Sequence, residues 1–525
     1  MNGAQSLMRT LVDCGVDTCF MNPGTSEMHF VAALDSVPEM SGVLALFEGV
    51  ATGACDGYAR MAGRPAAALL HLGPGLGNGL ANLHNARKGG VPVVAVVGDH
   101  ATYHKQYDAP LESDIETVAR NVSTFVRRSV KTGELGADAA DAVAAAIGPP
   151  GQVSTLILPA DVSWTDGGVP VAGLPGPAVP SSPDGTQVAA AAAALGSGQP
   201  VGILIGGRAG LAESLSAIGQ VASDTGARLF SETFVTRMRR GAGVVAPERL
   251  AYFGEMAAAQ LQGLAHLILV DARRPVSFFA YPGRPSDLVP EGCQVHTLAG
   301  AADDVPAAIH ALASDLGLTS SAAIRGGGTA RPGMAQAGFP TGPLTASSAA
   351  AVIGALLPEE AIVSDEANTS GLFLPEATAD APPHDWLQLT GGAIGLGLPL
   401  ALGAAVACPD RRVLALEADG SAMYTNQSWW TMAREGLDVT TVIFANRSYA
   451  ILNIELHRVG AEAEGPRAKA MLDLSRPELD FVSMARGMGV PATRALTAED
   501  MAEQLGRALS TPGPSVVEAV LVSER

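Results

Sequence analysis

Strongly basic segments, long apolar runs and paired cysteines are all missing from this sequence of 525 residues. Lys and Arg number 33 against 52 Asp and Glu, for a net charge of −19, and no basic cluster offers a surface for a phosphate backbone. We therefore expect no nucleic-acid partner. No apolar run approaches the roughly 18–20 residues that cross a bilayer, and the start, Met-Asn-Gly-Ala-Gln, lacks the basic residues of a signal peptide. We expect a soluble, cytoplasmic protein with no membrane partner.

The remaining composition is that of a globular α/β protein. The five cysteines are odd in number and form no Cys-x-x-Cys pair, so neither a disulfide framework nor a zinc site is predicted. Hydrophobic residues make up 47% of the chain and charged residues 16%, which excludes extensive disorder. The 61 glycines and 35 prolines indicate many tight junctions between strands and helices. A chain of this length should divide into roughly three domains.

Short apolar runs alternate with helix-like stretches in the first part of the chain. We expect strands at residues 17–21, 42–47, 66–71, 92–98 and 155–159, and helices at 3–14, 49–61 and 77–88. Connections this short favour a doubly wound parallel sheet. A stretch rich in Pro and Gly, at about 166–185, then links this first unit, residues 1–165, to a second.

The same alternation returns twice more. The second unit, 186–320, has predicted strands at 201–205, 228–230, 266–270 and 295–298, and a linker rich in Ser, Gly, Thr and Pro follows at about 319–342. The third unit, 343–525, has predicted strands at 361–364, 413–418, 440–445 and 514–522. The sequence therefore predicts an α/β fold of three doubly wound parallel-sheet domains, without a short internal repeat.

Polar clusters follow two predicted strands of the third unit. Asp419, Gly420 and Ser421 follow one strand, and Asn446 and Ser448 follow the next, with Asn446 27 residues beyond Asp419. Ligands bind at the carboxyl edge of an open parallel sheet, where a glycine lets the backbone approach a diphosphate. Asp419, the Asn446 amide oxygen and a backbone carbonyl near Ser448 are hard oxygen ligands that suit Mg²⁺. By itself, an Asp-Gly-Ser after a strand is more often a plain turn.

The run 419–421 together with Asn446 resembles the diphosphate-anchoring signature of the thiamine-diphosphate-dependent enzymes. The similarity is to the branch of acetolactate synthase, benzoylformate decarboxylase and pyruvate oxidase. Ala418 and Ala445 depart from the Gly and Asn that are usual in that family, but neither position supplies a side-chain ligand to the metal. The resemblance implies thiamine diphosphate and Mg²⁺ as cofactors.

A glycine-rich segment, residues 391–399, is similar to the family segment that carries a bulky aliphatic side chain under the cofactor. Gly392 and Ile394 fall on cofactor-binding positions, and the resemblance adds Tyr449 and Ala450 to the same set. The two rings of thiamine must be bent toward each other, and a branched side chain enforces this shape. Outside this context, Ile394 would be an ordinary core residue.

Glu48 follows an apolar strand and opens a helix of small residues. One interpretation is a first-turn acid that the helix dipole stabilises. The segment 46–60 is similar, however, to the family motif around its single essential glutamate, and Glu48 takes that position. The resemblance implies that the Glu48 carboxyl group bonds the aminopyrimidine ring and promotes loss of the proton from the thiazolium carbon, so that the cofactor can act as an electron sink.

The family resemblance also bears on assembly. In these enzymes, the glutamate of the first unit meets cofactor that is held by the third unit of a neighbouring protomer. A monomer would then lack a complete site. The resemblance therefore implies at least a homodimer, and commonly a homotetramer that is a dimer of dimers.

Two residues of the first unit bear on the substrate. Thr25, in the segment 22–29 that resembles the family loop over the active site, falls where benzoylformate decarboxylase-like enzymes place a serine, and it could hold the substrate carboxylate. His71 closes a predicted strand and matches a catalytic histidine of those decarboxylases, where it could donate a proton after loss of carbon dioxide. A lone histidine at a strand end is otherwise more often structural.

The match to the decarboxylases is incomplete elsewhere. Their second catalytic histidine has no counterpart in the similar stretch 275–281, and Glu455 stands near the position of an aromatic residue, which would make the pocket more polar. His100 and His104, in another strand-end loop, could also reach the site. The turn 206–210 could approach a nucleotide phosphate, but a glycine-rich turn is a weak signal, so FAD is not predicted.

The leading hypothesis is non-oxidative decarboxylation of a 2-oxo acid to an aldehyde, a lyase reaction, with carboligation as a side or main fate. The alternative is an acetolactate synthase-like transferase that joins two 2-oxo acids, and His71 favours the decarboxylase. A non-catalytic, cofactor-binding homologue is a third hypothesis, and the presence of Glu48 and Asp419 counts against it.

Overall fold

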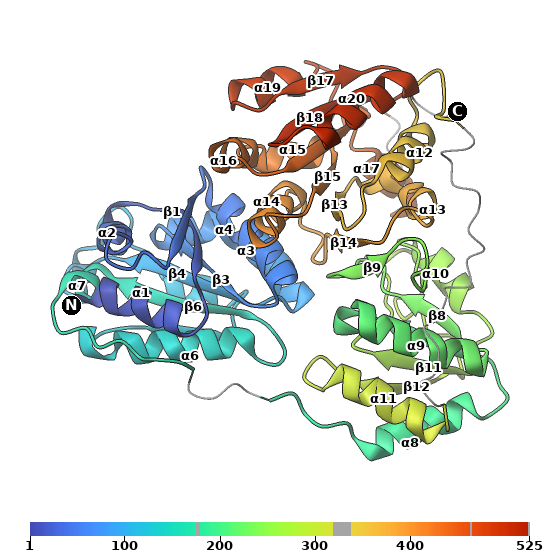
Figure 1. The fold of residues 1–525 in the computed structure, drawn as a ribbon, viewed down its shortest axis with the longest axis horizontal. Coiled ribbons are helices and arrows are strands. Elements are labelled where there is room, and N and C mark those ends of the chain that lie inside the picture. The colour runs from blue at the N-terminus through green and yellow to red at the C-terminus, as the bar shows by residue number, and fades with distance from the viewer. Residues whose placement is uncertain (175–178, 319–337, 462–464, 523–525) are drawn as a thin grey trace.

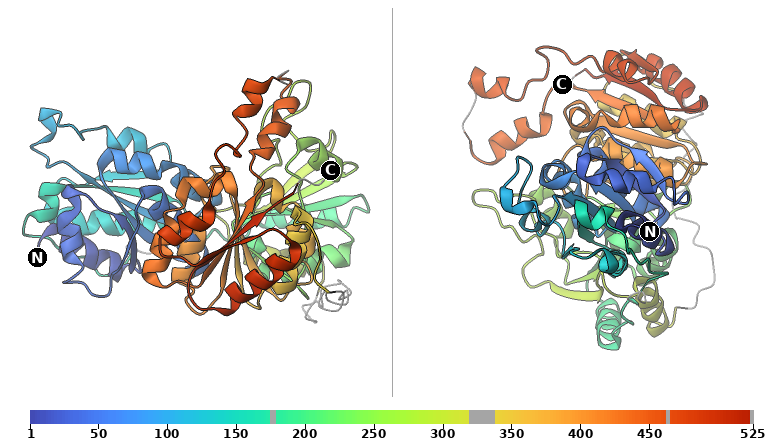
Figure 2. Two further views of the ribbon diagram at one scale, coloured as in Figure 1. Left: turned by 90° about the horizontal axis from the view of Figure 1, so that it is seen from above. Right: turned by 90° about the vertical axis from the view of Figure 1, so that its left-hand side faces the viewer.

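The computed structural model of the chain describes residues 1–174, 179–318, 338–461 and 465–522. Three sheets with flanking helices define a first, a central and a third unit (Figure 1). Seen from above, the third unit lies between the other two (Figure 2). The predicted class, an α/β fold of three units with mainly parallel sheets, is confirmed. Among the helices that these ranges contain, none is long and apolar enough to cross a membrane.

The first sheet has the order β2-β1-β3-β4-β6-β5, and each neighbouring pair is parallel. Its strands are β1 Thr18–Asn22, β2 Ser41–Leu44, β3 Ala66–Leu70, β4 Val93–Asp99, β5 Phe125–Arg128 and β6 Val153–Pro159. Its helices are α1 Gly3–Asp13, α2 Met28–Ala33, α3 Glu48–Ala62, α4 Leu72–Gly89, α5 Ile115–Ala119, α6 Leu135–Ile147 and α7 Ala160–Trp164. The sequence did not predict the edge strand β5, because its two arginines break the apolar pattern. It also began α4 five residues too late, since glycines and a proline fill the first turns of that helix.

The central sheet has the order β10-β8-β7-β11-β12. Its strands are β7 Val201–Ile205, β8 Arg228–Ser231, β10 Glu248–Arg249, β11 His266–Val270 and β12 Gln294–Ala299, and its helices are α8 Gly185–Leu195, α9 Ala212–Thr225, α10 Gly254–Leu261 and α11 Val305–Asp315. All four predicted strands of this unit are present. The predicted linker at 319–342 lies mostly outside the described residues.

The third sheet has the order β17-β18-β16-β15-β13-β14-β9. Its strands are β9 Met238–Arg240, β13 Ile362–Glu366, β14 His384–Gln388, β15 Val413–Ala418, β16 Val439–Ala445, β17 Ala492–Ala495 and β18 Ser515–Val520. Its helices are α12 Ala346–Leu356, α13 Leu374–Ala377, α14 Gly397–Ala407, α15 Asp419–Thr425, α16 Ser428–Glu435, α17 Ala450–Arg458, α18 Pro466–Ala470, α19 Phe481–Gly487 and α20 Ala498–Ser510. Strand β9 comes from the central segment and pairs antiparallel with β14, so the two units share a sheet edge. The sequence predicted neither β9, which reads Met-Arg-Arg, nor β14, which reads His-Asp-Trp-Leu-Gln, since neither contains a continuous apolar run.

Helices α3 and α14 join the first unit to the third by direct backbone contact. A Cβ atom on Gly57 would overlap the carbonyl oxygen of Leu400, and one on Gly403 would overlap the carbonyl oxygen of Ala54. Backbone atoms cannot move aside as a flexible side chain can, so both positions require glycine. The helices lie side by side at the centre of Figure 1.

A buried ion pair fastens all three units at one end of α3. Arg60 contacts Asp56 at 2.5 and 3.0 Å, and the side chains of both residues are fully buried. The same guanidinium donates to the carbonyl oxygens of Thr236, at 2.9 Å, and Gln388, at 2.7 Å. Because a buried charge is costly without partners, these four bonds tie the first unit to the central segment and to the third sheet.

The contact between α3 and α14 can be tested with Gly403→Val. We expect the substitution to cost about 2 kcal/mol or more, because the new side chain meets backbone rather than space. The measurement is the midpoint of thermal unfolding of the purified protein. Gly506→Ala is the matched control, since a Cβ there meets nothing within 4 Å, and it should stabilise helix α20 by about 0.5–1 kcal/mol. Equal midpoints for the two variants would contradict the packing argument.

Candidate active site

The predicted oxygen ligands emerge together at one edge of the third sheet. Strands β15 and β16 are parallel neighbours that end directly before Asp419 and Asn446. One carboxylate oxygen of Asp419 accepts a hydrogen bond from the Arg447 backbone N–H at 2.6 Å, and the other accepts from the Gly420 N–H at 2.8 Å. Burial raises the pKa of Asp419 to about 6. The carboxylate thus braces the two strand ends against each other.

The Asn446 side chain makes two hydrogen bonds that support the loop after β16. Its amide oxygen accepts from the Ser448 N–H at 2.9 Å, and its amide nitrogen donates to the Ser370 hydroxyl at 3.2 Å. Arg447 has a φ of 59°, in the left-handed region that costs a non-glycine residue roughly 1–2 kcal/mol. The Ser448 hydroxyl donates to the carbonyl of Leu472 at 3.2 Å, so its backbone carbonyl is the atom of Ser448 that suits a metal.

The start of α15 provides a narrow cradle. A Cβ on Gly420 would overlap the ring of Tyr449, which packs against this glycine. Ser421 is buried, and its hydroxyl accepts from the Asn368 amide at 3.0 Å. Helix α17 begins at Ala450, directly after Tyr449. All of these residues except Asn368 were predicted from the sequence.

The glycine-rich segment before α14 is anchored by a carboxylate that sequence analysis missed. Gly392 and Gly395 have φ values of +74° and +95°, which place the half-buried Ile394 on a turn that requires glycines around it. Glu366 accepts from the N–H groups of Gly395, at 2.7 Å, and Gly397, at 2.5 Å. In the sequence, Glu366 could have been noticed as an acid at the carboxyl end of a buried strand, but the predicted site did not include it.

A second missed carboxylate lies beside Glu366. Glu417 is completely buried, and both of its side-chain oxygens lack a hydrogen-bond partner among the described residues. Burial and the adjacent Glu366 hold the pKa of Glu417 well above its usual range. A Cβ on Gly397 would overlap this carboxyl group, so the pair packs directly under the start of α14.

Glu48 is the first residue of α3 and is 8% exposed. Its carboxylate accepts from the Asn78 amide at 3.0 Å, and a Cβ on Gly75 would come within 3.0 Å of its other oxygen, so this glycine packs closely against the carboxylate. The amide of Asn82 donates both to the carbonyl of Gly49, at 2.8 Å, and to that of Gly395, at 3.2 Å. The start of α3 and the glycine-rich segment therefore meet within one chain.

His71 precedes α4 at the carboxyl edge of the first sheet, and it has a partner that the sequence did not predict. Its Nδ1 lies 2.7 Å from the buried carboxylate of Glu27, which also accepts from the Gly24 N–H at 2.8 Å. Burial raises the pKa of Glu27, although the His71 hydrogen bond opposes this. A Cβ on Gly24 would overlap the imidazole, so the loop packs on the ring and carries the exposed Thr25 beside it.

Three other residues were expected near the substrate: Glu455, His100 and His104. Their surroundings differ from those of His71. Glu455 accepts from the Tyr281 hydroxyl at 2.8 Å and lies 3.6 Å from the Arg458 guanidinium. Its charge is thus compensated by its neighbours. The rings of His100 and His104 lie 5.3 Å apart between centroids, tilted by 53° to each other, in the loop after β4. Neither histidine contacts His71 in the described structure.

The central turn at 206–210 is surrounded by acids. The Arg208 N–H donates to Asp271 at 2.8 Å, and a missing Cβ on Gly206 leaves room that the Glu232 carboxylate fills. Burial raises the pKa of Asp271, and that of Glu232 to about 7. These carboxyl groups occupy the edge that a nucleotide phosphate would approach, which is an unfavourable environment for the phosphates of FAD.

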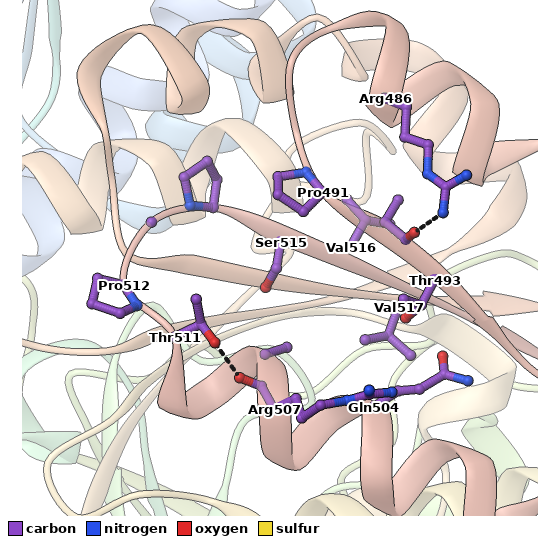
Figure 3. Close-up of a pocket in the computed structure, with 14 residues that line it drawn as sticks. Arg486, Pro491, Thr493, Gln504, Arg507, Thr511, Pro512, Ser515, Val516 and Val517 are labelled. Carbon is purple, nitrogen blue, oxygen red and sulfur yellow. Dashed lines mark hydrogen bonds between the residues drawn. The ribbon is translucent and has the colours of Figure 1, made fainter.

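A cavity of about 300 Å³ opens at the far end of the third unit, between α19, β17, α20 and β18 (Figure 3). Arg486, Gln504 and Arg507 are among its lining residues, and none of the predicted site residues is. Within the described ranges, no group of three or more His, Cys, Asp and Glu side chains could hold a metal. A cation at Asp419 would therefore need backbone and diphosphate oxygens as further ligands.

The donor set at the β15 and β16 edge suits Mg²⁺ and a diphosphate. Asp419, Asn446 and the Ser448 carbonyl each offer an oxygen atom, and Gly420 adds no side chain of its own to the turn. Two family models match the chain. They are "Thiamine pyrophosphate enzyme, N-terminal TPP binding domain" over residues 1–119 and "Thiamine pyrophosphate enzyme, C-terminal TPP binding domain" over residues 374–519.

This chain belongs to the thiamine pyrophosphate enzyme family. It is 60% identical, over all of its length and 99% of the relative's, to a Mycobacterium tuberculosis protein named "Putative acetolactate synthase large subunit IlvX". It is 28% identical to benzoylformate decarboxylase of Pseudomonas aeruginosa, over 96% of both chains. The predicted family is confirmed. The enzyme is related to both groups and uses thiamine diphosphate, with Mg²⁺ as is usual for the family.

Solved structures agree on the fold. The Rhodococcus jostii thiamine diphosphate-dependent 4-hydroxybenzoylformate decarboxylase superposes with a TM-score of 0.83 over the whole of both chains, at 21% identity. Benzoylformate decarboxylase from Polynucleobacter necessarius superposes with a TM-score of 0.79, also at 21% identity and over the whole of both chains. At this identity, the likeness extends to the fold of all three units and not to the substrate.

The predicted role of Asp419 as a metal ligand can be tested directly. Asp419→Ala should weaken binding of thiamine diphosphate in the presence of Mg²⁺ by about 10-fold or more, because a charged oxygen ligand is lost. Isothermal titration of the apoenzyme measures this affinity. Asp410→Ala, at an exposed position before β15, is the control and should bind as the parent does. Unchanged affinity in Asp419→Ala would exclude Asp419 as a ligand.

Proposed function

We propose that this enzyme decarboxylates a 2-oxo acid without an oxidant and releases the aldehyde, with carboligation as a second fate of the same site. The pairing of His71 with Glu27 carries the proposal. An imidazole whose Nδ1 is fixed by a buried carboxylate presents its Nε2 in one orientation, as a proton donor requires. Release of an aldehyde needs a proton at the carbon that loses carbon dioxide, whereas ligation to a second carbonyl compound does not.

The remaining roles follow from the chemistry of the cofactor. When bound, thiamine diphosphate supplies a nucleophilic carbon and an electron sink for the decarboxylation. Asp419, Asn446 and the Ser448 carbonyl would hold Mg²⁺ and thereby the diphosphate. Gly420 and Ser421 would approach the diphosphate, and the other cofactor contacts would come from Gly392, Ile394, Tyr449 and Ala450.

Glu48 would accept or share a proton at the aminopyrimidine ring. Its low exposure and its hydrogen bond from Asn78 keep the carboxylate in a place that bulk water scarcely reaches. Thr25, exposed beside the His71 ring, would bind the substrate carboxylate through its hydroxyl group. Glu27 would act as a positioning residue, because it touches the imidazole and not the substrate.

An acetolactate synthase-like reaction that joins two 2-oxo acids is the second candidate. The name of the 60% identical mycobacterial relative favours it. In that case His71 would line the acceptor side of the site and donate no essential proton. The two reactions share every step through loss of carbon dioxide, so product analysis distinguishes them.

We further propose a division of labour and an assembly. Residues 1–165 would bind the pyrimidine, 343–525 the diphosphate and Mg²⁺, and 186–320 would be the central unit between them in sequence. The enzyme would be a homodimer or a dimer of dimers, with Glu48 of one protomer completing the site at Asp419 of another. The family resemblance supports this assembly.

The reaction is tested with holoenzyme over a panel of 2-oxo acids, with carbon dioxide and organic products both measured. His71→Ala should lower aldehyde release by about 100-fold while thiamine diphosphate affinity is retained. Glu27→Gln should shift the pH profile of aldehyde release and leave cofactor affinity unchanged, which a purely structural role would not do. If pyruvate gives acetolactate and His71→Ala is nearly silent, the synthase reaction replaces the decarboxylase.

The role of Glu48 and the assembly can be tested together. Glu48→Gln and Asp419→Ala should each lower the activity by about 100-fold or more. If sites are shared between protomers, co-expression of the two variants should restore about a quarter of the parent activity, because half of the dimers are mixed and each mixed dimer has one intact site. Because the start of α3 and the glycine-rich segment also meet within one chain, absence of any restoration would show that each chain builds its own site.

A further inference from the structure

A short segment after β13 binds two of the loops at the carboxyl edge of the third sheet. This segment, η6 Asn368–Gly371, follows a strand that lies next to β15 and two positions from β16. The Asn368 amide donates to the Ser421 hydroxyl at 3.0 Å. The Ser370 hydroxyl accepts from the Asn446 amide at 3.2 Å. Asn368 and Ser370 are not among the residues proposed above for cofactor, metal or substrate, yet they connect η6 to both proposed cofactor loops.

The η6 segment holds the Ser370 hydroxyl in a defined place. Ser370 is 4% exposed, and its N–H donates to the carbonyl oxygen of Ala367 at 3.1 Å. Asn368 has a φ of 51°, in the left-handed region that Asn adopts more readily than most residues. Its amide also donates to the carbonyl oxygen of Glu366 at 3.1 Å, so side chain and backbone both support the turn. Because Ser370 is buried and its backbone is bonded, its hydroxyl cannot easily move away from Asn446.

The two ends of the Asn446 amide are held by different partners. An amide oxygen only accepts hydrogen bonds, and an amide nitrogen only donates them. The oxygen accepts from the Ser448 N–H at 2.9 Å and keeps a second lone pair, which is what a cation would need. The nitrogen donates to Ser370, its one acceptor among the described residues. Without that hydroxyl, the half-buried amide nitrogen would lack an acceptor, and the side chain would turn toward another one.

We propose that Ser370 is a positioning residue for Mg²⁺, because it holds the Asn446 amide with its oxygen available to the cation. Ser370 acts through Asn446 and does not touch the metal itself. This inference rests on the proposed role of Asn446 as a metal ligand. Partners that orient a ligand typically change metal affinity by roughly 10–100-fold when they are removed. The effect should therefore appear in the affinity for Mg²⁺ and not in the chemical step.

The affinity for Mg²⁺ is measured by calorimetric titration of the apoenzyme with thiamine diphosphate over a series of Mg²⁺ concentrations. Ser370→Ala should weaken the apparent affinity by about 10-fold, and Ser370→Thr, which keeps the hydroxyl, should weaken it less. At saturating Mg²⁺, kcat of Ser370→Ala should stay within about 2-fold of the parent. Ser163→Ala is the matched control, since this buried serine of α7 has a hydroxyl without a partner in the described structure. Parent-like Mg²⁺ affinity in Ser370→Ala overturns the proposal.

A second background tests whether Ser370 acts through the amide. The carboxylate of Asn446→Asp has an oxygen at both ends and no N–H group that needs an acceptor, so Ser370→Ala should not weaken Mg²⁺ binding further in that variant. An equal loss in both backgrounds overturns the proposal. If Asn446→Ala binds Mg²⁺ as the parent does, the proposed metal site is itself wrong, and the positioning role fails with it. A midpoint of thermal unfolding in the range of the Ser163→Ala control shows that each variant is folded.

Discussion

The close contact of helices α3 and α14 is the constraint on which the rest of this structure depends. The two helices touch backbone to backbone at Gly57 and Gly403, where no side chain could be accommodated. Helix α3 begins with Glu48, and α14 begins directly after the turn that presents Ile394. Because glycine brings the two backbones into contact, the functional ends of both helices are fixed relative to each other to within the tolerance of close packing. Rigid helices that hold a site at their ends provide the preorganised geometry that catalysis requires.

Buried carboxyl groups recur throughout the proposed site, and each does a different task. Asp419 braces two strand ends, Glu366 anchors the glycine-rich turn through two N–H groups, and Glu27 orients His71. The carboxyl oxygens of Glu417 have no hydrogen-bond partner among the described residues, and burial raises the pKa of Glu417 well above its usual range. An isolated buried carboxylate would be costly, and backbone N–H donors offset this cost for Asp419, Glu366 and Glu27. The site is therefore organised around acids, in a protein whose net charge is already −19.

The central unit contacts the third unit directly, in addition to being connected to it along the chain. Its strand β9 extends the third sheet, Arg60 binds carbonyl oxygens of both, and Tyr281 reaches Glu455 on α17.

The sequence by itself determined the family and the α/β class, and it led to the proposal of which residues hold the cofactor. Asp419, Asn446 and Glu48 could be proposed from the sequence because each follows an apolar run, and strand ends are visible as local patterns of hydrophobicity. Edge strands such as β5 and β9 could not, because exposure on one side removes the apolar pattern. The partners Glu27, Glu366 and Glu417 were also decided only by the tertiary structure. Each acts on a residue or turn distant in the sequence, and such pairings arise when parallel strands align their carboxyl ends in space, a relation that no local pattern encodes.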